Sequence, residues 1–252
     1  MKTAIAVLGW IFFLLISGFL FPVAAGSATV VDHEPYGVLL KAHVRNGVVD
    51  YKGLKSREAE LDRYLDMLAS VNSTTLSRDE RFAFFINAYN AWTLKLILSG
   101  YPGIESIKDL GSIFKSPWKK KISRIDGERV TLDHIEHDIL RPTFKDPRVH
   151  FAINCAAFSC PPLQSDPFLG ATLDEQLDRA TRSFINNPER NYLKGHILYV
   201  SRIFKWFGED FNDDIVGFFM RYARADLKEQ LEKQKGGIKV KYLPYDWSLN
   251  GS

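Results

Sequence analysis

The sequence predicts an α+β protein: a single domain with a central buried helix, surrounding helices and a small antiparallel sheet of hairpins. Three observations favour this fold class. The segment 77–98 has helix signals and is apolar on nearly every side, which is typical of a helix at the centre of a core. Asp126-Gly127 is a typical hairpin turn, and Asn46-Gly47 indicates a strand or turn element. Helices and hairpins are segregated, without the regular alternation of a doubly wound fold.

The composition is that of a globular protein and gives no sign of a nucleic-acid partner. The 252 residues are 46% hydrophobic and 25% charged. Lysine and arginine total 33 against 30 acidic residues, and the net charge of +3 lacks the strong basic excess of nucleic-acid binders. The 2 cysteines are too few for a disulfide-rich scaffold or a four-thiolate zinc site. We therefore expect a small-molecule or peptide substrate and no nucleic acid.

Residues 1–25 have the layout of a secretory signal peptide. One lysine precedes an apolar run, and a proline breaks the run just before the small residues Val23-Ala24-Ala25. We expect cleavage after this triplet, a flexible segment at 26–35 and one domain at 36–252, in a periplasmic or secreted protein. The alternative is an uncleaved segment that anchors the chain in a membrane, since the apolar run 4–20 is almost long enough to span a bilayer.

The remaining elements follow in order along the chain. Leucines at helical spacing within 56–71 predict an amphipathic helix. Ser77 and Glu80 form a capping box that opens the central helix, and Gly100-Tyr101-Pro102-Gly103 ends it. The later pattern predicts a hairpin around Asp126-Gly127, a short helix at 131–140 closed by Arg141-Pro142, a strand at 149–154, a helix at 172–185, a hairpin at 191–206, helices at 208–224 and 226–237, and a closing strand at 238–247.

The densest group of reactive side chains lies between His150 and Cys160. If 149–154 is a strand, His150 and Asn154 project on one face, beside the thiols of Cys155 and Cys160. A thiolate is the strongest side-chain nucleophile, and a nearby imidazole can activate it. Two cysteines this close in an exported chain are also consistent with a structural disulfide, and both alternatives stay open. Their spacing from His150 matches no usual zinc pattern, so we expect no metal and no cofactor.

Polar residues on two helices are further candidates. Asn87 and Asn90 lie three positions apart on one face of the central helix, and buried amides need hydrogen-bond partners. They either satisfy neighbouring backbone groups or line a site. Glu136 and His137 flank the apolar stripe of the helix at 131–140, so they either face solvent or serve as general acid–base residues in a cleft.

Five segments together resemble a known family, the domain of unknown function 547. They are FFINAYNAW at 84–92, TLDHIEHDILR at 131–141, RVHFAINCAAFSCPPL at 148–163, SRIFKWFGEDF at 201–211 and YDWSLN at 245–250. The resemblance implies a signature formed by Asn87, Tyr89, Asn90, Glu136, His137, Arg141, His150, Asn154, Cys155, Ser159, Cys160, Lys205, Trp206, Asp210, Asp246 and Trp247. It brings no established reaction, although similar domains are fused to glutaredoxin-like modules in animals, an association with thiol chemistry.

The chain order of Cys155 or Cys160, His196 and Asp210 also resembles that of transglutaminase-like thiol enzymes. His196 lies outside the signature of the family. In those enzymes the nucleophile starts a helix, whereas Pro161-Pro162 follow Cys160 here. This arrangement is therefore the weaker hypothesis for the site.

Two functional hypotheses follow from these residues. In the first, the domain is a thiol-dependent enzyme that performs thiol–disulfide exchange or acyl transfer such as amide hydrolysis. Its catalytic candidates are Cys155, Cys160, His150, His137 and Glu136, and its binding candidates are Asn87, Asn90, Asn154, Ser159 and Arg141. In the second, the domain is a non-catalytic extracytoplasmic binding module stapled by a Cys155–Cys160 disulfide.

Overall fold

Helix α4, Arg78–Leu98, is the central element of the fold, as the sequence predicts. Every residue from 82 to 94 is buried, so this helix has no solvent face. Ser77 caps it, because the Ser77 hydroxyl accepts the backbone N–H of Glu80. The expected second half of the capping box is wrong: the Glu80 carboxylate accepts instead from the amides of Val31, at 2.8 Å, and Gly170, at 3.1 Å. Glu80 therefore links two distant segments to the start of the central helix by hydrogen bonds.

The computed structural model describes residues 29–112, 114–234 and 236–252, so the predicted signal peptide lies outside the described residues. Within them, no helix is both long enough and apolar enough to cross a membrane. The other α-helices are α1 (Glu34–His43), α2 (Tyr51–Ser56), α3 (Glu58–Ser70), α5 (Leu132–His134), α6 (Arg141–Phe144), α7 (Leu173–Ile185), α8 (Ile203–Trp206), α9 (Ile215–Tyr222) and α10 (Ala225–Lys233).

Ordered packing begins earlier than the expected boundary at residue 36. Val31 and His33 are buried at 5% and 2% exposure, and α1 starts at Glu34. The cause is the contact between the Val31 amide and the Glu80 carboxylate, which ties this segment to the core. The part of the expected flexible segment that the structure describes therefore packs on the domain.

The strands form three small sheets, and two of the predicted turns lie at their hairpins. The strands are β1 (Val44–Arg45), β2 (Val48–Val49), β3 (Ser123–Ile125), β4 (Glu128–Val130), β5 (Tyr192–Lys194), β6 (Ile197–Val200) and β7 (Lys239–Tyr242). The hairpins β1–β2, β3–β4 and β5–β6 are antiparallel. Asn46-Gly47 and Asp126-Gly127 have positive φ angles, which the two-residue hairpin turns require. Strand β7 pairs parallel with β6, because α8, α9 and α10 carry the chain back before it re-enters the sheet.

The strand expected at 149–154 is wrong. Residues Pro147–Phe151 form a single 3₁₀ turn, and the chain then continues irregularly into the cysteines. The side chain of Asp146 caps this turn by accepting the Arg148 amide, and Pro147 fixes a helical φ at its first position. All residues from 149 to 154 are buried, so their alternation along the sequence does not separate an inner from an outer face.

The helix expected at 131–140 does not end at Arg141-Pro142. Helix α5 passes into a π-helical turn, Ile135–Leu140, and then into α6, which ends at Phe144. The Arg141 amide bonds to the Glu136 carbonyl, five residues back, and so widens the turn. Pro142 has no amide to offer and lies in the first turn of α6, where none is needed. Single π-helical turns are often found at functional sites.

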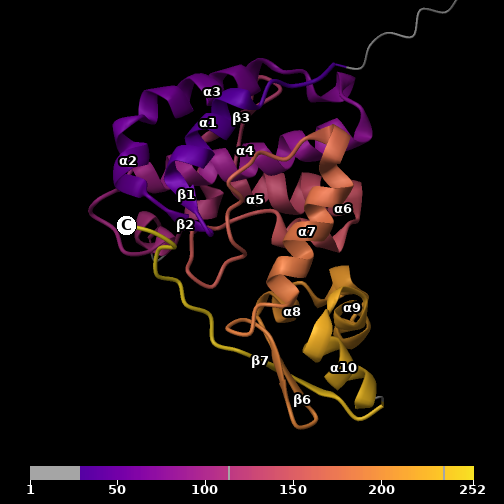
Figure 1. The fold of residues 1–252 in the computed structure, drawn as a ribbon. Helices are drawn as coiled ribbons and strands as arrows, with labels where there is room; N and C mark the ends of the chain where they lie inside the picture. The colour runs from indigo at the N-terminus through magenta and orange to yellow at the C-terminus, as the bar shows by residue number, and fades with distance from the viewer. Residues whose placement is uncertain (1–28, 113, 235) are drawn as a thin grey trace, which may run out of the picture.

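The C-terminal segment links the two ends of the molecule. In Figure 1, α1 to α4 gather at one end and α9, α10, β6 and β7 at the other, and the segment after β7 runs back from the second end to the first. There it pairs with β2, through the bonds between Val49 and Asn250 and between Ser252 and Val49. One apolar cluster surrounds α4, and a second packs Phe151 against α7, α8 and α9.

Candidate functional site

Cys155 and Cys160 face each other across a tight turn. Their sulfur atoms lie 2.9 Å apart, and the Cys155 amide donates to the Cys160 sulfur at 2.8 Å. A disulfide bond is about 2.05 Å long, so the two residues are free thiols here. Cys155 is partly exposed, whereas Cys160 is 7% exposed. The pair therefore consists of one accessible and one sheltered thiol.

Two asparagine side chains hold the turn that carries the thiols. From α4, the Asn90 amide donates to the Ala152 carbonyl at 2.9 Å and accepts from the Asn154 amide at 2.8 Å. Asn154 in turn donates to the Pro161 carbonyl and accepts from the Ala156 amide. Ala156 is buried with a φ of +63°, a conformation that costs a non-glycine residue free energy unless its surroundings fix it. These bonds therefore impose the conformation that brings the sulfurs together.

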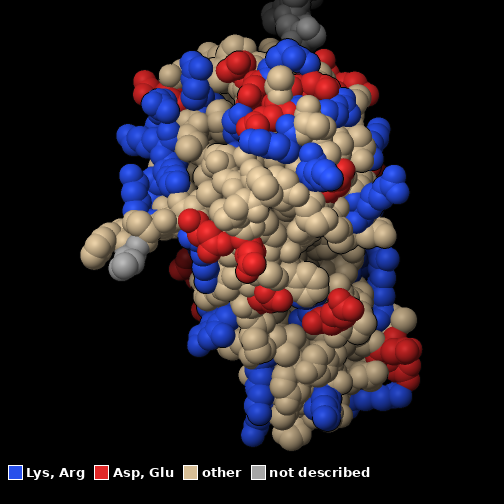
Figure 2. All heavy atoms as spheres, turned by 90° about the vertical axis from the view of Figure 1, so that its left-hand side faces the viewer, with Lys and Arg blue, Asp and Glu red and all other residues tan. Residues whose placement is uncertain are grey.

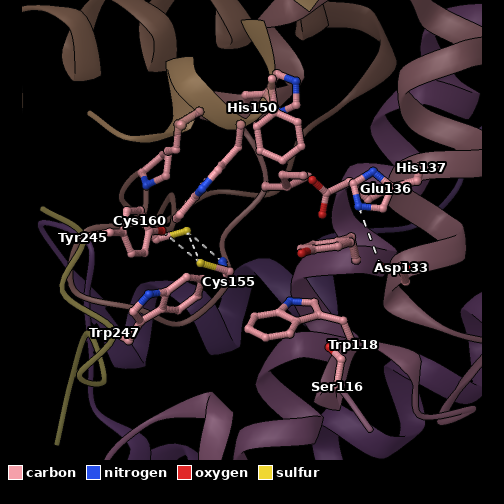
Figure 3. A pocket seen from close by; sticks show the side chains of 16 residues that line it. Ser116, Trp118, Asp133, Glu136, His137, His150, Cys155, Cys160, Tyr245 and Trp247 are labelled. Carbon is pink, nitrogen blue, oxygen red and sulfur yellow. Dashed lines mark hydrogen bonds and ion pairs between the residues drawn. The ribbon is translucent and has the colours of Figure 1, made fainter. Parts of the chain in front are cut away.

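The C-terminal segment covers the same turn. The amides of Phe158 and Ser159 donate to the carbonyls of Ser248 and Asp246, and the Asn250 amide donates to Ala156. The Ser159 hydroxyl accepts the Asp246 amide at 2.9 Å. This pairing places the aromatic residues Tyr245 and Trp247 beside the thiols, as Figure 3 shows.

The surroundings of the two thiols differ in a way that separates their acidities. Hydrogen bonding to Cys160 lowers the pKa of Cys155 and outweighs the opposing effect of its partial burial, and the Tyr245 hydroxyl, 3.2 Å from the Cys155 sulfur, also lowers it. Burial, followed by the neighbouring Cys155, raises the pKa of Cys160 well above its ordinary value. Cys155 is therefore the thiol that ionises first.

The thiols lie in the wall of a pocket of about 200 Å³. Six of its sixteen lining residues are tyrosine, tryptophan or phenylalanine, and two acidic and two histidine side chains also line it. The lining residues are Tyr89, Ser116, Trp118, Asp133, Glu136, His137, His150, Ile153, Cys155, Cys160, Pro161, Ile203, Trp206, Phe207, Tyr245 and Trp247. In Figure 3 the thiols, Tyr245 and Trp247 lie on one side, and Glu136, His137 and Asp133 lie on the other.

Glu136 and His137 come from the π-helical turn. Glu136 is 8% exposed and lines the pocket together with Tyr89 of α4. Burial, followed by the charge of Glu136, raises the pKa of Tyr89 well above its ordinary value, so Tyr89 stays a neutral donor. The His137 Nδ1 faces an Arg141 nitrogen at 3.1 Å, and its Nε2 lies 3.7 Å from Asp133. Because Arg141 can only donate, His137 accepts at Nδ1 and carries its proton at Nε2.

His150 belongs to a different network at the edge of the pocket. Its Nε2 bonds to Asp210 at 2.6 Å, and its ring stacks on Phe207 with centroids 4.1 Å apart. The Arg141 Nε donates to the same Asp210 oxygen at 2.6 Å. Burial acts to raise the pKa of Asp210, but the bonds from His150 and Arg141 outweigh it and hold that pKa well below its ordinary value.

The five catalytic candidates from the sequence all line this one pocket: Cys155, Cys160, His150, His137 and Glu136. The binding candidates lie around it. Asn87 clamps both backbone groups of Phe168, and Asn90 and Asn154 hold the cysteine turn. Ser159 bonds to the C-terminal segment, and Arg141 lies behind His137 and Asp210. The amides of the two α4 asparagines therefore satisfy buried backbone groups.

Other pocket residues were not among the sequence candidates. Trp118 had no local signal that marked it for a site. Asp133, Phe207 and Tyr245 lie within segments that carry the family resemblance but were not catalytic or binding candidates, whereas Trp206 and Trp247 were part of the family signature. His196 is exposed beside the β5–β6 turn and does not line the pocket, and Asp210 pairs with His150 instead. Within the described ranges, no group of three or more His, Cys, Asp or Glu residues is arranged to hold a metal ion.

Fold and site together define an α+β protein with a dithiol pocket walled by aromatic side chains. The family model described as "Protein of unknown function, DUF547" matches residues 73–185, and this match supports assigning this part of the chain to that family. The matched span includes α4, the π-helical turn and both cysteines, and it ends before Trp206, Asp210 and the C-terminal segment. No curated protein and no solved structure matches the chain.

Proposed function

We propose that this domain is a thiol–disulfide exchange enzyme in which Cys155 is the attacking thiol and Cys160 the resolving thiol. The observation that carries the proposal is the 2.9 Å separation of two free sulfurs with unequal surroundings at a pocket. The accessible thiol has the lowered pKa, and the sheltered thiol lies within reach of it. An exchange enzyme needs this division of roles.

The reaction balances with the protein thiols alone. The Cys155 thiolate attacks one sulfur of a substrate disulfide, the substrate S–S bond breaks, and a substrate thiolate leaves. That thiolate takes the proton of Cys160, and the Cys160 sulfur then attacks Cys155 and expels the second substrate thiolate. The substrate gains two electrons and the protein becomes a Cys155–Cys160 disulfide, which an external dithiol must reduce before the next cycle.

Formation of the mixed disulfide at Cys155 makes Cys160 easier to ionise, which favours its attack on Cys155. The negative charge of Cys155 is one cause of the raised pKa of Cys160, after burial. A mixed disulfide at Cys155 removes this charge. The Cys155 amide, 2.8 Å from the Cys160 sulfur, then stabilises the Cys160 thiolate as a hydrogen-bond donor.

Acyl transfer is less well supported by the same geometry. A cysteine nucleophile in that chemistry is ordinarily paired with a histidine base. Among the described residues, no hydrogen bond joins either cysteine to a histidine, since His150 is engaged with Asp210 and His137 with Arg141. Disulfide exchange requires no such base once the thiolate is formed.

We propose further that the domain works outside the cytoplasm, in a periplasmic or secreted form. The support is the signal-like layout of residues 1–25. A structural Cys155–Cys160 disulfide in a binding module is the alternative in such a compartment. N-terminal sequencing of the exported form should find a terminus at Gly26, and an intact Met1 on a membrane-bound product would contradict cleavage.

The test of the enzymatic proposal uses the reduced protein and bis(2-hydroxyethyl) disulfide, followed by mass spectrometry. The wild type should release two thiols and form the internal disulfide, whereas Cys160→Ser should stop at a mixed disulfide on Cys155. Cys155→Ser should react far more slowly, because the remaining thiol is buried and has a raised pKa. If both single variants react at the same rate, or if the wild type does not react, the proposal is wrong.

A further inference from the structure

Apart from its two histidines, the pocket lining has charged side chains of one sign only. Asp133 and Glu136 line it, and its lining contains no lysine or arginine. The whole chain has a net charge of +3, and on the face in Figure 2 basic and acidic side chains are interspersed around an uncharged area. The acidic character is therefore a property of the pocket and not of the surface in general.

Six tyrosine, tryptophan and phenylalanine rings form a large part of the remaining wall. Tyr245 and Trp247 pack with ring centroids 4.6 Å apart, and Trp206 lies 4.8 Å from Tyr245 and 5.7 Å from Trp247. Trp118 meets Trp247 edge-on at 5.8 Å. The faces of such rings attract cations, and tryptophan does so most strongly. Lys108, outside the pocket lining, already places its ammonium group 3.8 Å from the centre of the Trp247 ring.

Glu136 lacks a cationic partner. Among the described residues, no lysine, arginine or histidine forms an ion pair with its side chain, and the nearby His137 lies against Asp133 and Arg141 instead. The side chain is more than nine-tenths buried, and in Figure 3 its carboxyl group points toward the interior of the pocket. A buried carboxylate without a counter-charge is unfavourable, so a cationic ligand group would stabilise this position.

We propose that the pocket selects substrates that carry a small cationic group, of the ammonium type, close to the reacting sulfur. The cation would lie between Glu136 and the aromatic wall while the sulfur meets Cys155 on the opposite side. Glu136 and Cys155 line the same pocket from opposite sides (Figure 3), and a volume of about 200 Å³ suits a small molecule or a single side chain. The inference rests on the proposed function in taking Cys155 as the reacting group.

The test measures charge selectivity at a single thiol. In Cys160→Ser, Cys155 is the only cysteine of the chain. Its modification rates are measured with 2-(trimethylammonium)ethyl methanethiosulfonate and with the anionic 2-sulfonatoethyl methanethiosulfonate, each divided by the rate with 2-mercaptoethanol in solution. Dividing by the solution rate corrects for the different intrinsic reactivities of the two reagents. Because both reagents modify any accessible thiol, the test does not depend on the biological reaction of the protein.

The corrected ratio of cationic to anionic rate should exceed one by about tenfold and should fall by a similar factor when Glu136→Gln is added. Asp133→Asn should also lower the corrected ratio, so the test remains valid if Glu136→Gln does not fold. Glu175→Gln, an exposed residue away from the pocket, should leave the ratio unchanged. A ratio near one, a preference for the anion, or equal ratios with and without Glu136 would overturn the inference.

The two proposals fail separately. If the wild type converts bis(2-hydroxyethyl) disulfide but shows no charge selectivity, the exchange function stands and the cationic substrate is wrong. If the selectivity is present but no internal disulfide forms with any disulfide, the pocket binds cations and the exchange function is wrong.

Discussion

Replacing Asn90 by alanine should both destabilise the protein and loosen the thiol turn. The Asn90 side chain is 3% exposed and bonds two backbone groups at once, the Ala152 carbonyl at 2.9 Å and the Asn154 amide at 2.8 Å. Among the described residues, no other side chain of α4 forms a hydrogen bond with the segment that leads into Cys155. Asn90→Ala removes both partners without removing the two buried backbone groups that need them.

The magnitude follows from those two groups. Each buried backbone group left without a hydrogen bond costs about 1–3 kcal/mol, and partial relaxation recovers some of this cost. We therefore expect Asn90→Ala to lower the free energy of unfolding by about 2–4 kcal/mol. Urea unfolding under reducing conditions measures it, with an unchanged dependence on urea concentration showing that the unfolded states are comparable.

A matched control distinguishes the loss of the two buried Asn90 hydrogen bonds from the loss of any asparagine side chain. Asn187 also accepts a backbone amide, that of Glu189, but at an exposed turn. Asn187→Ala should cost less than about 1 kcal/mol. In Asn90→Ala the alkylation of Cys160 should accelerate relative to Cys155, because the turn no longer holds its buried position. A cost below about 1 kcal/mol and unchanged alkylation would refute the assignment of Asn90 as the support of this turn.

Three further predictions concern the core, the thiol and the acidic network. Phe85→Ala should cost about 3–5 kcal/mol in urea unfolding, since this side chain is 1% exposed on the central helix, and a loss below about 1 kcal/mol would contradict its place in the core. Tyr245→Phe should raise the pKa of Cys155, seen as an upward shift in the pH profile of alkylation, because a donor to the sulfur is lost; an unmoved profile would contradict that contact. Asp210 has a lowered pKa in the folded protein, so its ionised form stabilises the fold above pH ~4, and this contribution is lost as the pH falls further. The difference in the free energy of unfolding between wild type and Asp210→Asn should therefore shrink below pH ~4. A difference that stays constant with pH would contradict the stabilising role of the ionised Asp210.

The central helix and the hairpins could be predicted because their signals are local. A capping serine, an apolar run and a glycine–proline stop define α4 without reference to the rest of the chain. Asn46-Gly47 and Asp126-Gly127 adopt positive φ angles that few other residues tolerate, so the turn chemistry alone indicates them. In both cases the deciding interactions lie within a few residues of one another.

The strand at 149–154 was mispredicted because its evidence was not local. Apolar alternation indicates a strand only where one face is exposed, and here both faces are buried. The signals for the observed turn were Asp146 and Pro147, which precede the segment. The parallel pairing of β7 with β6 likewise depends on where three helices carry the chain, which no residue pattern in β7 reveals.

The candidate site divides in the same way. The thiols and the nearby histidines stand out by residue type, whereas the carboxylate that binds His150 comes from a segment 60 residues later. The aromatic wall depends on the return of the C-terminal segment. Residue types in a local window therefore identified the reactive groups, and the contacts that tune them came from long-range packing.

This dependence bears on how much of the chain the proposed chemistry needs. The family match covers 73–185, yet Tyr245 touches the Cys155 sulfur from a segment 90 residues after it. That segment is fixed at its far end, where Gly251 approaches Val49 so closely that an added Cβ would lie 1.9 Å from the Val49 carbonyl oxygen. A side chain at position 251 would therefore have to displace the contact between the end of this segment and β2. The matched span contains both thiols, but the Tyr245 hydroxyl, which adds to the effect of Cys160 on the pKa of Cys155, and the aromatic residues Trp206, Phe207, Tyr245 and Trp247 of the pocket lie beyond it.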